Sequence, residues 1–293
     1  MKIIKSSLAG FCFGVRRAVD IIYEELEKGG SQIYTLGKII HNDDFNAELE
    51  QKGVKIISAD ELDKVDPENS VVILRAHGSL VETYQELKRR GIRYIDTTCP
   101  YVAKIQNIAS SNKSEDTVIF IIGDRDHPEI RSICSFAREG IKNDNVFVFK
   151  NSQELEQHSQ KLNHLYDKRT ILFAQTTQKI DEWKKCLNIA QKLYTNLTIF
   201  DTICNVTEKR QMDADAISKQ VDLMLVIGGN DSSNTKKLAE VTSKNCLTRH
   251  IQNASEIPYD IIQPEMAVGI TAGASTPDRI IEEVTQNVRS KKS

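Results

Sequence analysis

Three cysteines stand in a repeated sequence frame that is suited to metal binding. Cys99 and Cys204 each end an Asp-Thr-x-Cys sequence, and Cys12 lies in Gly-Phe-Cys-Phe-Gly-Val. A basic residue follows each cysteine at the same spacing, and the three are Arg17, Lys104 and Lys209. Thiolates gathered at one point repel one another unless a cation holds them, and iron–sulfur clusters and zinc are the usual occupants. We therefore predict that Cys12, Cys99 and Cys204 are metal ligands.

The local sequence places each of these cysteines at a corner between a strand and a helix. A short β-like run precedes each one and a charged, helix-like run follows it. A helix N-terminus lowers the pKa of a thiol and so favours the form that binds metals. Any one cysteine taken alone could equally be a small buried apolar residue. That alternative is our prediction for Cys134, Cys186 and Cys246, which lack the frame.

Alternating strand-like and helix-like segments run along the whole chain. Strands that alternate with helices of this length are typical of an α/β fold with parallel sheets. The cysteines are 87 residues (99 minus 12) and 105 residues (204 minus 99) apart. These intervals predict three related α/β units, which we assign to residues 1–96, 97–199 and 200–293, the last including a C-terminal helix.

Polar side chains follow the predicted strands at their carboxyl ends, where parallel sheets bind ligands. They are His41, His77, His127, Glu129, Thr176, Ser232, Ser233, Asn234 and Ser275. The serines and Asn234 stand at predicted helix starts, where free backbone N–H groups favour a phosphate. The alternative is that they are helix caps and that the histidines are structural. The lysine and glycine pattern of a P-loop is absent, and the absence of a Gly-x-Gly-x-x-Gly turn after a strand argues against a nicotinamide cofactor.

Composition limits the function classes further. The chain has 293 residues, a net charge of -2 and a pI near 6.3, which gives no electrostatic reason to expect nucleic acid as a partner. No apolar stretch approaches the roughly 20 residues that span a bilayer, so we expect no membrane association. We expect a cytoplasmic protein, in which the six cysteines do not form disulfides.

Nine motifs, in this order, resemble the 4-hydroxy-3-methylbut-2-enyl diphosphate reductase (LytB/IspH) family. They are Cys12-Phe-Gly-Val, Ile40-His-Asn, Ala76-His-Gly, Asp96-Thr-Thr-Cys-Pro, His127-Pro-Glu, Gln175-Thr-Thr, Asp201-Thr-Ile-Cys-Asn, Ser232-Ser-Asn and Thr271-Ala-Gly-Ala-Ser. The resemblance runs from residue 10 to about residue 278. Each motif alone is weak evidence, but nine in sequence are highly specific.

The resemblance implies a trefoil of three α/β units around a 4Fe-4S cluster held by Cys12, Cys99 and Cys204. One iron would then have no protein ligand and could bind the allylic hydroxyl of the substrate. The implied reaction removes that hydroxyl as water, with two electrons and two protons, and yields isopentenyl diphosphate and dimethylallyl diphosphate. Glu129 would supply protons, if burial raises its pKa, and Thr176 would relay or orient them.

The resemblance also implies the binding partners. The diphosphate would be held by His41, His77, His127, Thr176, Asn205, Ser232, Ser233, Asn234 and Ser275. Histidine suits this role because a nearby polyanion favours its protonated form. The implied electron donor is a low-potential protein such as a ferredoxin or flavodoxin.

The chain departs from the family pattern around the predicted proton donor. Asp124, Arg125, Asp126 and Arg131 add charges beside His127 and Glu129. Two other classes of function remain as alternatives. A zinc-dependent hydrolase of a phosphorylated substrate could use three thiolates, and a non-catalytic cluster- or phosphate-binding protein could share the cysteines and serines but would have little use for Glu129 and Thr176.

Overall fold

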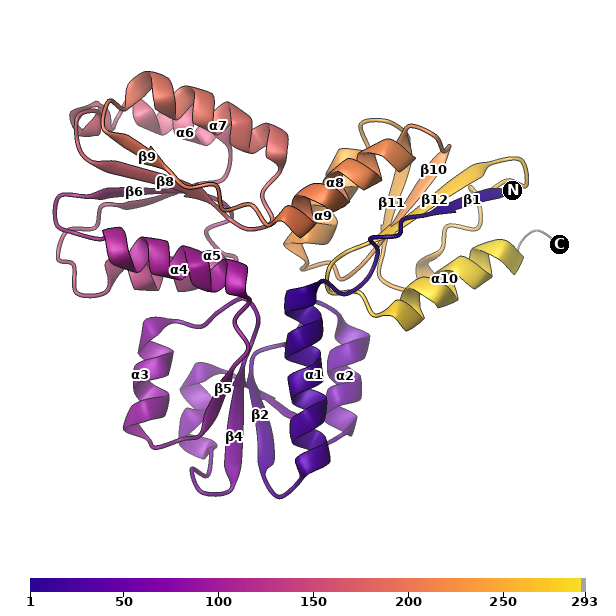
Figure 1. Ribbon diagram of the computed structural model, residues 1–293. Helices are drawn as coiled ribbons and strands as arrows, with labels where there is room; N and C mark the ends of the chain where they lie inside the picture. The colour runs from indigo at the N-terminus through magenta and orange to yellow at the C-terminus, as the bar shows by residue number, and fades with distance from the viewer. Residues whose placement is uncertain (291–293) are drawn as a thin grey trace. The chain divides into compact units, whose positions relative to one another are not determined.

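The computed structural model describes residues 1–290 and has an α/β fold with three four-stranded sheets (Figure 1). The first sheet has the strand order β1 (Lys2–Lys5), β12 (Ala267–Ala272), β10 (Leu223–Ile227), β11 (Leu247–Ile251). The second sheet has the order β3 (Lys55–Ile57), β2 (Gln32–Leu36), β4 (Ser70–Leu74), β5 (Tyr94–Asp96). The third sheet has the order β7 (Val146–Phe149), β6 (Val118–Ile122), β8 (Thr170–Ala174), β9 (Leu197–Ile199). The neighbouring strands pair in parallel, as in β4 with β5 and β8 with β9. The predicted fold class with three sheets is confirmed.

The three sheets share one strand order. In each, two consecutive strands are neighbours (β2 and β3, β6 and β7, β10 and β11), the next strand lies on the other side of the first of them, and one further strand (β5, β9 or β1) lies beyond that one at the edge of the sheet. β5, β9 and β1 each lie at one edge of their sheet, and each leads to one of the predicted metal-binding cysteines. β1 pairs with β12, with Lys5 opposite Ile270, so the N-terminal strand completes a sheet whose other strands come from the last third of the chain.

The predicted boundaries at residues 96 and 199 coincide with the ends of β5 and β9. β1, which lies in the first predicted segment, instead shares a sheet with the strands of the last one. The division into three segments, and their trefoil arrangement, stay predictions.

Buried apolar runs explain the inner strands. The sequences Ser-Val-Val-Ile-Leu of β4, Val-Ile-Phe-Ile-Ile of β6 and Leu-Met-Leu-Val-Ile of β10 are buried at every position. Continuous apolar strands of this kind are typical of parallel sheets with both faces covered. β3 and β11 are edge strands with exposed positions, and their weak hydrophobic signal explains why the sequence did not predict them.

The chain forms two compact units. One contains Met1–Lys28, Lys38–Lys55 and the segment from Asn205 onward, and the other contains Gly29–Gly37 and Ile56–Cys204. The helices of the first unit are α1 (Phe13–Lys28), α2 (Asp43–Gln51), α8 (Asn205–Ser218), α9 (Ser233–Thr242), η3 (Ala254–Glu256) and α10 (Asp278–Ser290). Those of the second are η1 (Ala59–Lys64), α3 (Val81–Arg89), α4 (Pro100–Asn112), α5 (Pro128–Arg138), α6 (Ser152–Ser159), η2 (Asn163–Leu165) and α7 (Ile180–Leu193). Within the described residues, no helix is both long and apolar enough to cross a bilayer.

Candidate functional site

The three predicted metal ligands occupy equivalent corners of the fold. Each cysteine is half-buried, follows an edge strand and directly precedes a helix. Its backbone amide donates a hydrogen bond to a carbonyl two residues beyond the end of the neighbouring strand. The pairs are Cys12 with Ala274 (3.2 Å), Cys99 with Ala76 (3.0 Å) and Cys204 with Thr176 (3.0 Å). The repeated sequence frame therefore corresponds to a repeated backbone geometry.

The threonine of the Asp-Thr-x-Cys sequence has a structural role. The hydroxyl of Thr97 donates to the carbonyl of Leu74 at 2.5 Å, and the hydroxyl of Thr202 donates to the carbonyl of Ala174 at 2.6 Å. Both acceptors are the last residues of a strand next to the cysteine-bearing strand. These two bonds tie each corner to the edge of its sheet.

Arg210 takes over that function at Cys12, where Gly10 stands in place of threonine. Its guanidinium is buried and donates to the carbonyl of Gly10 at 2.6 Å and to the carbonyl of Ala272 at 3.0 Å. Ala272 ends β12, so the bridge joins the same two segments that a threonine joins elsewhere. Sequence reasoning missed Arg210, because nothing in its own surroundings marks it as part of the first cysteine motif.

We predict that an Arg210→Met variant is less stable by about 2–4 kcal/mol, since two hydrogen bonds from a charged donor are lost and two carbonyls are left unsatisfied. Urea unfolding of the variant measures this loss. The matched control is Lys209→Met at the exposed neighbouring position, which should unfold like the unmodified protein. Equal stability of the two variants would show that the bridge does not hold the Cys12 corner.

The helix N-termini make the three corners suitable for thiolates. Cys99 is the N-cap residue of α4, and the carbonyls of Cys12 and Cys99 accept the first helical hydrogen bonds, from Arg16 and Ala103 at 2.9 Å. The positive end of a helix dipole stabilises a negative sulfur. The local surroundings of each cysteine therefore favour the thiolate, the form that binds metals.

The other three cysteines lie in less favourable surroundings. Burial raises the pKa of Cys134, and burial raises the pKa of Cys186 to about 12. Burial also raises the pKa of Cys246, which is half-buried. A raised pKa keeps the sulfur protonated, and protonated sulfur is a poor metal ligand. These residues are the ordinary thiols that the sequence predicts.

Glu129 and Thr176 contact each other directly. The carboxyl group of Glu129 accepts hydrogen bonds from the backbone N–H and from the hydroxyl of Thr176, both at 2.7 Å. Both residues are buried, and Glu129 is only 2% exposed. Because the carbonyl of Thr176 also accepts from the amide of Cys204, Thr176 links the buried carboxyl group to a predicted metal ligand. Sequence spacing alone does not reveal this contact, since the two residues are 47 positions apart.

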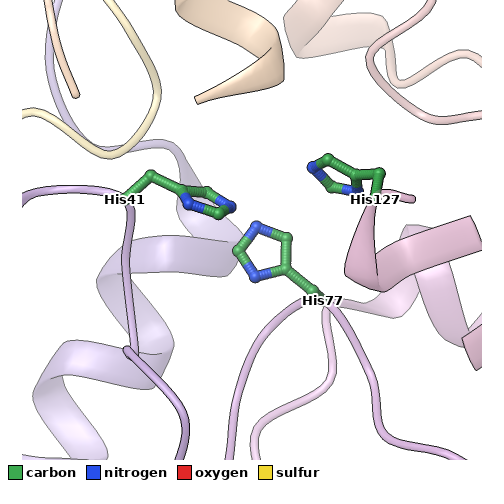
Figure 2. A group of neighbouring side chains, drawn as sticks. All are labelled: His41, His77 and His127. Carbon is green, nitrogen blue, oxygen red and sulfur yellow. The ribbon is translucent and has the colours of Figure 1, made fainter. Parts of the chain in front are cut away.

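His127 begins helix α5 and its ring has a defined hydrogen-bonding state. The residue is buried, and its Nδ1 accepts from the backbone N–H of Glu129 at 3.2 Å. A neutral ring that accepts at Nδ1 carries its proton on Nε2, so Nε2 is a donor. The ring of His77 lies edge-on to that of His127, with centroids 5.5 Å apart (Figure 2). Two ring donors side by side suit an anionic ligand.

His41 lies in a loop that is fixed by its neighbours. Asn42 is the N-cap residue of α2, and the side chain of Asn46 donates to the carbonyls of Ile40 and Asn42 at 2.8 Å and 2.6 Å. Gly229 packs closely on this loop, because a Cβ at that position would overlap the carbonyl oxygen of His41. The half-buried His41 is thereby held next to the turn that follows β10.

The turn after β10 and the start of α9 carry Ser232 and Asn234 of the predicted diphosphate site. Ser232 is the N-cap residue of α9 and accepts from the backbone N–H of Thr235, and both are buried. Asn234 is also buried, and its Nδ2 donor has no hydrogen-bond partner in the described chain. A buried amide donor without a partner is costly, and a bound oxyanion would satisfy it.

The other predicted diphosphate ligands of this unit are Ser275, Ser233 and Asn205. Ser275 is buried in the turn that follows β12, the strand next to β10. The two turns are joined, because the amide of Gly273 donates to the carbonyl of Ile227 at 2.8 Å. Ser233 is half-buried in the first turn of α9, whereas Asn205 is exposed at the start of α8.

The unusual charges beside the His127 motif are accessible at the surface. Asp124, Arg125, Asp126 and Arg131 are all exposed. Arg125 pairs with Glu154 at 2.6 Å, and the carboxyl group of Asp124 accepts from the backbone N–H of Asp126. None of these bonds involves Glu129, so the charged residues that depart from the family pattern leave the contact between Glu129 and Thr176 in place.

Comparisons with known proteins agree with the motifs. The family model described as LytB protein matches residues 3–289. A 4-hydroxy-3-methylbut-2-enyl diphosphate reductase of Thermoanaerobacter sp. (strain X514) is 42% identical over 99% of this chain and 97% of its own, and that of Caldanaerobacter subterraneus subsp. tengcongensis is 41% identical over 100% and 98%. The solved E-1-hydroxy-2-methyl-but-2-enyl-4-diphosphate reductase of Plasmodium falciparum superposes with a TM-score of 0.87 at 26% identity, covering 97% of this chain and 87% of that chain. A solved (E)-4-hydroxy-3-methyl-but-2-enyl diphosphate reductase, called the terminal enzyme of the non-mevalonate pathway, has a TM-score of 0.69 at 34% identity and covers 99% and 100%.

Proposed function

The chain belongs to the LytB protein family, and on that premise we propose that it reduces 4-hydroxy-3-methylbut-2-enyl diphosphate to isopentenyl diphosphate and dimethylallyl diphosphate. The observation that carries the proposal is the contact between the buried Glu129 and Thr176, with Thr176 in turn bonded to the amide of Cys204. A purely structural or phosphate-binding protein has no need for a buried acid connected in this way to a metal ligand.

The family implies an iron–sulfur cluster, and we propose that it is a 4Fe-4S cluster bound by Cys12, Cys99 and Cys204. The three equivalent corners, each at a helix N-terminus, support this donor set because all three favour thiolates. When bound, such a cluster supplies electrons and a Lewis-acidic iron for the leaving hydroxyl group. The remaining steps fall to the residues of this chain.

We assign proton delivery to Glu129. Hydroxide is a poor leaving group, so the substrate hydroxyl must be protonated as its bond to carbon breaks, and a positioned carboxylic acid can do this. Thr176 hydrogen-bonds to the carboxylate form of Glu129; once Glu129 is protonated, its O–H would donate to the hydroxyl of Thr176, and that hydroxyl would donate to the leaving hydroxyl of the substrate. Thr176 then orients the substrate hydroxyl and connects it with the acid.

The diphosphate is assigned to three histidines and to the polar groups after β10 and β12. His41, His77 and His127 supply ring N–H donors, and protonation of His41 or His77 would add charge to these bonds, whereas His127 donates from Nε2 while its Nδ1 accepts from the amide of Glu129. Ser232, Ser233, Asn234 and Ser275 supply hydroxyl and amide donors at helix starts. Asn205 completes the proposed set at the first turn of α8, next to Cys204.

The electrons would come from a low-potential protein such as a ferredoxin or flavodoxin, and we propose a cytoplasmic location. The decisive test is the oxidation of a reduced viologen by protein purified without oxygen. Oxidation that depends on the allylic diphosphate, together with iron and sulfide in the protein, would support the proposal. Zinc in place of iron, or no substrate-dependent oxidation by protein with a full cluster, would refute it.

We predict that His127→Ala raises the KM by about 10–100-fold, since a hydrogen bond to a charged group contributes about 1.5–3 kcal/mol. The absorbance of the cluster should not change. His127→Asn is the matched variant, because asparagine can still cap helix α5 but lacks the ring Nε2. A substrate affinity unaltered in both variants would remove His127 from the binding site.

A further inference from the structure

A cavity lies in the unit that contains His77 and His127, next to the loops that carry them. Its volume is about 420 Å³, within the range of small-molecule sites. It opens at the carboxyl ends of β2 and β4, where Gly37 and Arg75 each follow the last residue of a strand. Gly78 and Ser79 of the His77 loop and Arg131 of α5 complete its polar wall.

Two arginines that form no ion pair within the described residues line this cavity. Arg75 is half-buried and Arg131 is exposed, and within residues 1–290 neither guanidinium takes part in an ion pair or a hydrogen bond. Arg75 packs over Gly37, with its Nη1 only 3.0 Å from where a Cβ would lie. Burial and the nearby charge of Arg131 both lower the pKa of Arg75. The one acid in the lining, Asp60, is exposed and not paired with either arginine.

Partly desolvated like charges are unfavourable unless an anion lies between them. One guanidinium group can donate two parallel hydrogen bonds to two oxygens of a phosphate or carboxylate, a geometry that lysine cannot provide. We infer that the cavity between Arg75 and Arg131 is a binding site for a phosphate or diphosphate group, separate from the residues assigned to the substrate.

A ligand here would contact the segments that support the proposed substrate residues. Gly78, which follows His77, lines the cavity, and a Cβ there would lie 2.8 Å from the hydroxyl of Ser132. That hydroxyl donates to the carbonyl of Ser79 at 2.7 Å, so the His77 loop is fastened to α5. Pro128, which follows His127, also lines the cavity. Occupation of the site would therefore order both histidine loops and tighten substrate binding.

Binding stoichiometry tests the inference, with inorganic phosphate, pyrophosphate and isopentenyl diphosphate titrated separately into the holoenzyme. We expect the unmodified protein to bind two equivalents of at least one of these ligands, and Arg131→Met to lose one of them or to bind it at least 10-fold more weakly. Arg138→Met is the matched control, because Arg138 lies on the same helix and is paired with Asp144. It should bind like the unmodified protein. The ligand that is lost shows whether the occupant is an inorganic ion or the reaction product.

The proposed substrate site is tested separately with His127→Ala, which should bind the other equivalent at least 10-fold more weakly. If Arg131→Met binds all three ligands like the unmodified protein, the inference is wrong, whatever His127→Ala does. If Arg131→Met loses an equivalent but His127→Ala loses none, the inference stands and the substrate assignment fails. Equal losses in Arg131→Met and Arg138→Met would reduce the effect to general surface charge and would also overturn the inference.

Discussion

A Glu129→Gln variant is expected to reduce the allylic diphosphate about 10²–10⁴-fold more slowly, the usual contribution of a positioned general acid. The loss should appear in kcat, because the carboxyl group acts on the leaving hydroxyl and not on the diphosphate. Steady-state oxidation of a reduced viologen measures kcat and KM, and the visible absorbance reports the cluster.

Glutamine is suited to this test because it preserves the local structure. Its side-chain oxygen can still accept from the amide of Thr176, and its NH₂ group can donate to the threonine hydroxyl, which accepts instead of donating. The shape and the two contacts remain, but the transferable proton is gone. Protein stability and cluster content should therefore match those of the unmodified protein.

Glu139→Gln is the matched control for this substitution. Glu139 follows the same helix α5, is exposed, and its contacts are with Lys113 and Gln85 at the surface. This variant should keep full activity. A Glu129→Gln enzyme with an unchanged kcat would mean that another group, or water, protonates the hydroxyl.

The sequence was informative wherever one short segment contains both the signal and its cause. The Asp-Thr-x-Cys frame is visible because the threonine that anchors each corner lies two residues from the cysteine that it supports. The buried strands β4, β6, β8 and β10 are equally visible, since their apolar runs are continuous. Features that depend on residues close together in the sequence can therefore be predicted from the sequence.

Features that depend on long-range contacts could not be predicted in the same way. Arg210 supports the Cys12 corner from 200 positions away along the chain. The pairing of β1 with β12 likewise joins the two ends of the chain, and the alternation of strands and helices does not specify which strands are neighbours. The pair of arginines that line the cavity beside the His77 loop belongs to this group, because only the fold brings them to one cavity.

Replacing any one of Cys12, Cys99 and Cys204 by serine should have the largest effect of all, with loss of the cluster and of measurable activity. A serine keeps the backbone amide bonds of the corner but removes the thiolate ligand. Iron and sulfide per chain, measured after purification without oxygen, should fall in all three variants. Each corner provides one ligand, so no neighbouring residue replaces the missing sulfur.

Cys246→Ser is the matched control, because Cys246 is also a half-buried free thiol but burial raises its pKa. It should retain its iron and sulfide and its activity. The comparison also separates the rival functions, since a zinc hydrolase would lose zinc, not iron, in the same three variants. If a Cys12→Ser, Cys99→Ser or Cys204→Ser protein kept a full cluster and full activity, the equivalence of the three corners would be structural only. The proposed cluster needs one sulfur ligand from each of the three corners, so each cysteine must be required for it.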